Sequence, residues 1–278
     1  MEIPPAWPGL PAGATRFSGR VRLVAEAVSF ERRGAAAVVT IDRQERRNAI
    51  DGPTAELLAA AYDRFEADDE ARVLVLTGAG GVAFCAGADL KSIDSMGERL
   101  ADPRGPLGFS RVVSSKPTIA AISGWCLAGG FELALWCDLR VATAGSKLGF
   151  TERRFGVPLI DGGTQRLPRI VGLGRALDLI LSGRIVDGDE ARDIGLLTEV
   201  VPEGEHLERA LEIAGALARF PQDTMLLDRR AAIEGSTLPL SDGLELEARS
   251  GPATLETAWR GAGRFASGEG RGGEGAGV

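Results

Sequence analysis

The chain has 278 residues, of which 44% are hydrophobic and 26% charged, an ordinary globular composition that excludes a disulfide mini-domain and a disordered chain. Its formal net charge of -7 argues against a nucleic-acid surface, because phosphate binding needs clustered cations. A single histidine, His206, and three cysteines without CxxC spacing cannot form a HExxH zinc site or a zinc finger. We therefore expect no metal, and chemistry carried by carboxylates, backbone groups or a bound cofactor.

Both ends of the chain are expected to be disordered. Residues 1–20 are rich in Pro, Gly and small side chains, and residues 267–278 read SGEGRGGEGAGV. The N-terminal segment carries no basic and apolar signal pattern, and the scattered cysteines Cys85, Cys126 and Cys137 are typical of a reducing compartment. The sequence therefore predicts a cytoplasmic protein.

One apolar window, Thr118 to Cys137, is long enough to cross a bilayer and has Glu132 as its only charged residue. Gly124, Gly129 and Gly130 divide it into shorter pieces, and the carboxylate would be costly in lipid. A buried strand, a glycine turn and a buried helix are the better interpretation, so we expect no membrane segment.

In chain order, strand patterns alternate with helical ones up to about residue 202. The strands are expected at 28–32, 35–41, 73–77, 118–122 and 139–142, and a helix at 54–67 has one apolar face. Such alternation indicates an α/β fold with a mostly parallel sheet. After Pro202 the patterns are helical only, at 206–220, 224–234, 240–248 and 255–265. We predict an α/β core over 21–202 and an α-helical part over 203–266.

The segment FCAGADLK, Phe84 to Lys91, follows the third expected strand and a glycine-rich turn. Small residues after a strand leave peptide N–H groups uncovered and let a ligand approach closely. The simpler interpretation is a tight turn in which Asp89 caps a helix that begins near Ser92.

The segment GWCLAGGFELAL, residues 124–135, predicts a strand, a glycine pair and an apolar helix. The first N–H groups of such a helix have no partners within it and lie at the positive end of its dipole, so they can hold an oxyanion. Glu132 lies one turn inside this helix. It either pairs with a buried arginine or has a raised pKa suited to proton transfer.

A second carboxylate, Glu152, closes a short strand-like run before a glycine-rich loop that opens a helix, with the sequence continuing from Asp161 to Pro168. Two carboxylates and two N–H donors suffice to move protons next to a carbonyl group. The alternative is that Glu152 pairs on the surface with Arg153, Arg154 or Arg166. Sequence separation does not show whether Glu132 and Glu152 converge.

Together these segments resemble the enoyl-CoA hydratase/isomerase family, the crotonase superfamily, from about Val28 to Phe265. The match is carried by IDRQERRNAI, FCAGADLK, SGWCLAGGFELALWCDLRVA, FTERRFGVP and GGTQRLPRIVG, in that order. The resemblance implies an α/β, crotonase-like (ClpP/crotonase) spiral core of ββα units. It also implies that the helical C-terminal part, 203–266, forms trimers that often pair into hexamers, although its apolar residues could equally form an intrachain core.

The resemblance also implies the roles of individual residues. The N–H groups of Ala88 and Gly129 would form an oxyanion hole for a thioester carbonyl, which would stabilise an enolate-like transition state. Glu132 would activate water for attack on C3, and Glu152 would deliver a proton to C2. The reaction would be reversible syn hydration of a 2-enoyl-CoA, with CoA as part of the substrate and no cofactor. The expected CoA-binding strip contains the following residues: Arg46, Arg47, Ala49, Ala86, Asp89, Leu90 and Lys91.

One departure concerns the acyl pocket. Family hydratases usually read P-G-x-G-G-T after the second glutamate, whereas this chain has Ile160 at the glycine position and Asp161 after it. Ile160 is expected to reshape the pocket, and Asp161 either adds a third carboxylate or caps the following helix. The departure leaves double-bond isomerase, decarboxylase or hydrolase activity open. A non-catalytic acyl-CoA binder is the alternative of another class.

Overall fold

The computed structural model describes residues 27–269, so the disorder expected for 1–20 and for nearly all of 267–278 lies outside the described residues. Six strands form the main sheet in the order β1-β2-β3-β5-β7-β10. β1 is antiparallel to β2, and the remaining neighbours are parallel. The strands are β1 (Val28–Arg33), β2 (Ala36–Ile41), β3 (Val73–Gly78), β5 (Thr118–Ile122), β7 (Leu139–Thr143) and β10 (Glu199–Val201). The expected strands and the mostly parallel sheet are confirmed.

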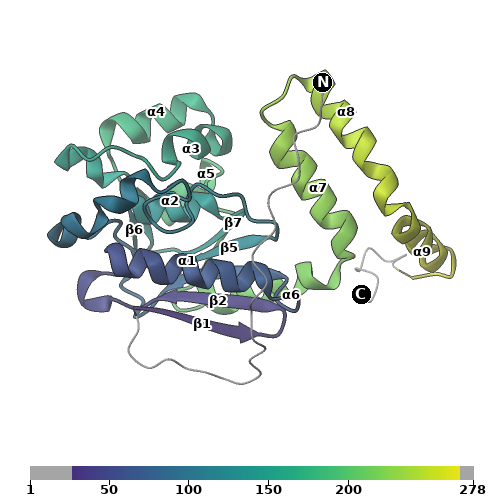
Figure 1. The fold of residues 1–278 in the computed structure, drawn as a ribbon, viewed down its shortest axis with the longest axis horizontal. Coiled ribbons are helices and arrows are strands. Elements are labelled where there is room, and N and C mark those ends of the chain that lie inside the picture. The colour runs from purple at the N-terminus through teal and green to yellow at the C-terminus, as the bar shows by residue number, and fades with distance from the viewer. Residues whose placement is uncertain (1–26, 270–278) are drawn as a thin grey trace.

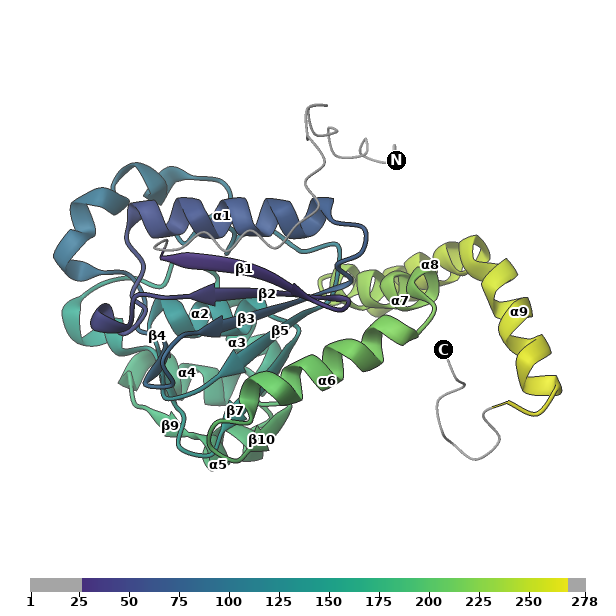
Figure 2. The ribbon, with the colours of Figure 1, turned by 90° about the horizontal axis from the view of Figure 1, so that it is seen from below.

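Helices cover both faces of this sheet (Figures 1 and 2). Because side chains alternate along a strand, Leu74 and Leu76 of β3 pack in the cluster shared with α1 (Gly52–Ala67), while Val73 and Val75 pack in a second cluster. The second cluster includes Ala210 of α6 (His206–Arg219). Alternate side chains of β3 therefore face α1 on one side of the sheet and α6 on the other.

A second sheet of four short strands brings the candidate site together. Its order is β4-β6-β8-β9, with β4, β6 and β8 parallel. Its strands are β4 (Ala83–Cys85), β6 (Trp125–Leu127), β8 (Lys147–Gly149) and β9 (Val186–Asp187). The segments that follow β4, β6 and β8 contain Ala88, Gly129 and Glu152 respectively. Carboxyl ends of neighbouring parallel strands meet at one edge of a sheet, which is where ligands bind in open α/β folds.

Most of the remaining helices surround the strands. They are η1 (Gln44–Arg46), η2 (Leu90–Met96), η3 (Glu98–Ala101), α2 (Gly129–Trp136), η4 (Thr151–Phe155), α3 (Gly163–Val171), α4 (Leu173–Ser182) and α5 (Gly188–Asp193). The window Thr118 to Cys137 folds as β5, β6 and α2, as the strand, turn and helix interpretation predicts. Within 27–269, no helix combines the length and apolar character that a membrane span requires.

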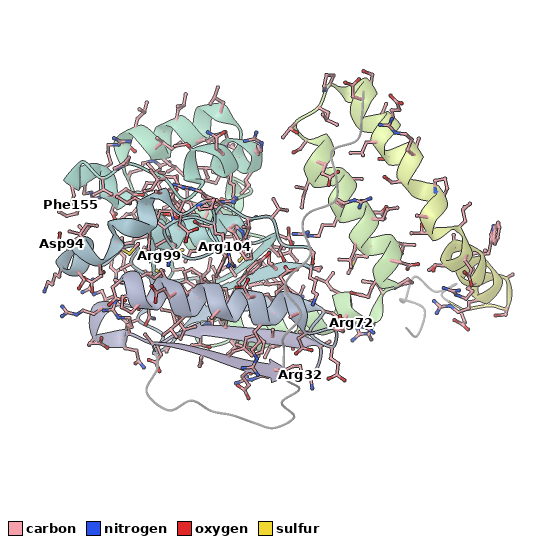
Figure 3. All side chains as sticks on the ribbon, viewed as in Figure 1. Arg32, Arg72, Asp94, Arg99, Arg104 and Phe155 are labelled. Carbon is pink, nitrogen blue, oxygen red and sulfur yellow. The ribbon has the colours of Figure 1, made fainter. Side chains whose placement is uncertain are left out.

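The predicted boundary at residue 202 marks a change in secondary structure, but packing changes later in the chain. Leu207, Leu211, Ile213 and Leu217 of α6 pack against the core cluster of the chain's own sheet. Arg72, labelled in Figure 3, donates to the carbonyl oxygen of Ala218 at 2.6 Å and ties the end of α6 to the start of β3. By its packing, α6 therefore belongs to the core.

The helices after α6 project away from the core (Figure 1). They are α7 (Gln222–Gly235), α8 (Leu240–Ser250), η5 (Gly251–Thr254) and α9 (Leu255–Ala266), and none of them contains a buried residue. Arg229 of α7 anchors this arm, because its guanidinium pairs with the carboxylate of Asp138 at 2.9 and 3.0 Å and donates to the carbonyl of Ser114 at 2.7 Å. We call α7 to α9 the C-terminal arm.

Candidate active site

Two uncovered peptide N–H groups lie side by side where β4 and β6 end. The N–H groups of Ala88 and Gly129 have no hydrogen-bond acceptor within residues 27–269. A Cβ built on Gly87 would lie 2.9 Å from the nitrogen of Gly129, and one built on Gly129 would lie 3.8 Å from the nitrogen of Ala88. The preceding Ala128 adopts a φ of 52°, a strained conformation for an alanine. The two donors expected to form an oxyanion hole are therefore neighbours.

Glu132 lies inside α2 with its carboxylate buried and fixed. Its Oε1 accepts hydrogen bonds from the N–H groups of Asp161, at 3.0 Å, and Gly163, at 2.7 Å. Gly163 allows this approach, because a Cβ there would lie 2.9 Å from that same oxygen. Burial, followed by the negative charge of Asp161 and more weakly that of Glu152, raises the pKa of Glu132 to about 8. No arginine pairs with Glu132 in the described chain, so the proton-transfer interpretation is the one that its surroundings favour.

Glu152, in η4, is a second buried carboxylate, and neither of its oxygens has a hydrogen-bond partner within the described residues. Burial raises its pKa to about 7, against weaker opposing effects of its own backbone N–H and of the positive charge of Arg153. The alternative of a surface ion pair is wrong, because Glu152 is buried and none of the three arginines pairs with it. Arg153 and Arg154 donate instead to the carbonyls of Ile180 and Gly183, and Arg166 donates to those of Asp161 and Ser110. The negative charge of Glu152 contributes to the raised pKa of Glu132.

Asp161 is a third buried carboxylate, and its backbone contacts Glu132. The alternative in which it caps the following helix is wrong, because α3 begins at Gly163 after Gly162 and has no side-chain cap. Its Oδ1 instead accepts hydrogen bonds from the N–H of Leu107 at 3.2 Å and from the hydroxyl of Ser110. Ile160 is partly exposed, and its carbonyl accepts from the guanidinium of Arg111. The third-carboxylate alternative is thus the one that the geometry supports.

The predicted CoA strip is made of two chain segments that run alongside each other. Ile50 N–H donates to the carbonyl of Gly87, Asp89 N–H donates to the carbonyl of Ile50, both at 2.8 Å, and Ala86 N–H donates to the carbonyl of Arg47 at 3.1 Å. The residues of the strip differ in their exposure to solvent. Arg46, Arg47, Leu90 and Lys91 are exposed, Ala86 is partly exposed, and Ala49 and Asp89 are buried.

Arg47 also lines a cavity of about 180 Å³ between residues 44–48 and 79–83, and neither Glu132 nor Glu152 lines that cavity. Arg46, Arg47 and Lys91 are exposed cations that a phosphate group could reach. Asp89 is buried and has a structural role. Its carboxylate accepts from the N–H of Lys91 at 3.1 Å, as the capping interpretation predicts, and pairs with Arg43 at 3.1 Å.

Sequence reasoning missed the role of Arg43. Its guanidinium pairs with Asp51 at 2.8 Å and with Asp89, and it donates to the carbonyl of Ala49, so it joins both segments of the strip. The segment IDRQERRNA contains three arginines, and no spacing rule distinguishes the structural one from its exposed neighbours. Within the part of the chain that the structure describes, no cluster of His, Cys, Asp and Glu could hold a metal ion.

Comparisons with known proteins agree with this architecture. The family model described as enoyl-CoA hydratase/isomerase matches residues 31–268. A probable enoyl-CoA hydratase of Rhizobium meliloti (strain 1021) is 38% identical over 81% of this chain and 88% of its own. The short-chain-enoyl-CoA hydratase of Clostridium acetobutylicum is 35% identical over 80% of this chain and 87% of its own.

A solved structure of an enoyl-CoA hydratase from Bacillus anthracis superposes with a TM-score of 0.81 at 33% identity, over 87% of this chain and 96% of that chain. The agreement extends from sequence to the arrangement of strands and helices, and it confirms the expected crotonase-like fold. The chain belongs to the enoyl-CoA hydratase/isomerase family.

Proposed function

We propose that the protein is an enoyl-CoA hydratase that adds water reversibly, in the syn sense, across the 2,3 double bond of a CoA thioester. The observation that carries this proposal is that the parallel strands β4, β6 and β8 end at one edge of the second sheet, where the segments that follow them hold the paired N–H groups of Ala88 and Gly129 and the buried carboxylates Glu132 and Glu152. The names of the relatives from Rhizobium meliloti and Clostridium acetobutylicum support the same reaction.

In this proposal the thioester oxygen accepts hydrogen bonds from Ala88 and Gly129. These donors are fixed by the backbone before the reaction, so they stabilise the negative charge that develops on that oxygen as an enolate-like transition state forms. The N–H of Gly129 is the first of α2 and has no acceptor within the helix, and the positive end of the helix dipole lies there, so it favours the same negative charge.

The two glutamates divide the proton transfers. Glu132 accepts a proton from water as the water oxygen bonds to C3, while Glu152 donates a proton to C2, so that one water molecule is added overall. The two N–H groups on Oε1 orient the Glu132 carboxylate, whereas the unpartnered Glu152 is poised to carry a proton near neutral pH. The reaction needs no redox group, and CoA enters as part of the substrate.

The CoA moiety is proposed to lie along the strip formed by residues 46–50 and 86–91. Lys91, Arg46 and Arg47 are exposed cations suited to its phosphates, and Ala49, Ala86, Leu90 and the backbone at Asp89 border the pantetheine. Ile160 is proposed to narrow the acyl pocket.

We also propose a cytoplasmic homotrimer or hexamer. The three cysteines of the chain are free and buried, which supports a location in a reducing compartment. The C-terminal arm has large apolar side chains at the surface of the single chain, which supports burial against other copies.

The proposed activity is tested with the purified protein and a short 2-enoyl-CoA. We expect loss of the enoyl-thioester absorbance and formation of the 3-hydroxyacyl-CoA. A matched assay with a 3-enoyl-CoA distinguishes the isomerase alternative, because an isomerase forms the 2-enoyl product from it. Binding of acyl-CoA without turnover of either substrate would contradict the proposal and support the non-catalytic alternative.

A further inference from the structure

Asp161 is a buried carboxylate that the proposed chemistry does not use. The residue is 4% exposed, and both hydrogen bonds to its side chain, from Leu107 N–H and Ser110 Oγ–H, end on Oδ1. These partners lie in the loop of residues 102–111, far from Asp161 in sequence. A buried carboxylate is costly, so its contacts with a distant loop require an explanation.

Two arginines hold the same loop against the turn that contains Asp161. Arg111 donates from Nε and Nη2 to the carbonyl of Ile160, at 3.1 and 3.0 Å. Arg166 donates from Nη1 to the carbonyl of Asp161 at 2.8 Å and from Nη2 to the carbonyl of Ser110 at 2.6 Å. Asp161 is therefore the centre of a set of contacts between the loop and the turn.

The far side of the loop is braced as well. Arg99 donates to the carbonyl of Pro106 at 3.0 Å, and Arg104 pairs with Asp63 of α1 at 2.7 Å. Figure 3 labels both arginines, which lie over α1 in that view. The loop is thus held between α1 on one side and the Asp161 turn on the other.

The turn and the loop each contact a group that the proposed reaction uses. The N–H of Asp161 itself donates to Oε1 of Glu132, and the side chain of Leu107 lies next to Gly129, since a Cβ there would be 2.9 Å from Leu107 Cδ1. A shift of the turn would therefore move a donor to Glu132, and a shift of the loop would move the neighbour of an oxyanion donor.

We propose that Asp161 is a positioning residue for Glu132, which locks the 102–111 loop to the 160–163 turn and places a negative charge beside the Glu132 carboxylate. The proposal rests on the proposed function, because it assigns Glu132 the transfer of a proton from water.

The charge has a defined direction of effect. The charged and titratable groups around the pair are Glu152 of η4, Arg166 of α3, Arg111 of the loop and Cys85 of β4. Among these, the negative charge of Asp161 is the largest charge effect on the pKa of Glu132, and it raises that pKa. Loss of the charge lets Glu132 ionise at lower pH.

Two substitutions separate charge from geometry. Asp161→Asn retains an oxygen acceptor for Leu107 and Ser110 but removes the charge, so the low-pH limb of the kcat/KM profile should move to lower pH by about half to one unit. Asp161→Ala also removes the acceptor, and kcat should fall at least about tenfold at every pH, with a smaller change in KM. Asp193→Asn, on the exposed face of α5, is the matched control and should leave the profile unchanged.

A pH profile of Asp161→Asn that superposes on that of the unmodified protein would overturn the proposal, as would an unchanged kcat in Asp161→Ala. A double-mutant cycle with Glu132→Gln, read from thermal stability between pH 5 and 8, needs no turnover. The effect of Asp161→Asn on the pH dependence should be smaller when Glu132 is already neutral. Additive effects of Asp161→Asn and Glu132→Gln would overturn the proposed coupling, whether or not the protein is a hydratase. If the two effects are coupled but the protein does not hydrate enoyl-CoA, the proposed function alone is contradicted.

Discussion

At the scale of single residues, the site is defined by two carboxylates, Glu132 and Glu152, that the fold buries without an ion pair to any described residue. Glu132 receives two backbone N–H groups, and Glu152 receives no hydrogen bond from the described residues. Burial in this form disfavours the ionised state, so each group holds its proton to a higher pH in the folded chain than in the unfolded chain. The raised pKa that suits Glu152 as a proton donor near neutral pH therefore also reduces the free energy of unfolding as pH rises.

Glu152→Gln should reveal this cost. The pKa of Glu152 rises from 4.5 to about 7 on folding, so its favourable contribution is complete below pH 4.5 and is lost as pH rises through 7. The free energy of unfolding of the variant, relative to the unmodified protein, should therefore increase by about 2 to 3 kcal/mol between pH 5 and pH 8. Urea unfolding at both pH values measures it. Glu208→Gln, at an exposed position, is the control, and an equal pH dependence in all three proteins would refute the explanation.

At the scale of elements, the site depends on short parallel strands that end at one edge. The turn after β4 and the turn after β6 approach so closely that position 87 accepts only glycine without a steric clash. Its φ of +91° also favours glycine. A side chain there would meet the Cβ of Ala128 at 2.8 Å as well as the Gly129 nitrogen. Backbone packing between two turns thus sets the spacing of the two N–H donors.

Gly87→Ala should disturb that spacing more than it disturbs the fold. We expect kcat for hydration to fall about 10²-fold or more, the usual cost of a displaced oxyanion donor. The matched control is Gly34→Ala, because Gly34 also has a positive φ, +60°, but no atom lies within 4 Å of its added Cβ. The control shares the conformational cost and should retain kcat. Equal losses in both variants would show that conformational strain, rather than donor placement, is responsible.

At the scale of the whole molecule, the C-terminal arm stands apart from the core. Its apolar surface residues include Leu240 at 79% and Trp259 at 70% exposure, values that leave large side chains in water in a single chain. Its described anchor is the charge pair of Arg229 with Asp138, and its helices bury no residue. The arm is therefore the part of the chain with the most to gain from contact with other copies.

Trp259→Glu should weaken the proposed assembly. A charge in the apolar surface of α9 should shift the species seen in sedimentation velocity from trimer or hexamer toward monomer at micromolar concentration. Glu256→Gln, exposed on the same helix, should sediment like the unmodified protein. A monomeric unmodified protein, or a Trp259→Glu variant that still assembles at the same concentrations, would contradict the assignment of the arm.

Local patterns predicted the strands and the helices after residue 206 well, because β2 and β3 are continuous apolar runs typical of buried strands and α6 has an apolar face at helical spacing. They could not predict that α6 packs on the chain's own sheet, since the same apolar face suits either an intrachain or an intermolecular partner. They could not predict the partners of Asp161 either. Leu107 and Ser110 lie in a loop without periodicity, and their contacts depend on the three-dimensional approach of the loop to the turn.

The central claim is that Glu132 and Glu152 act together on one water molecule. The most direct test is single-turnover hydration of a short 2-enoyl-CoA by Glu132→Gln and by Glu152→Gln, with substrate affinity measured separately. Each variant should retain acyl-CoA binding and lose at least about 10²-fold in rate, and the double variant should lose little more than the worse single one. Turnover near the unmodified rate in either single variant, with folding and binding intact, would contradict the claim.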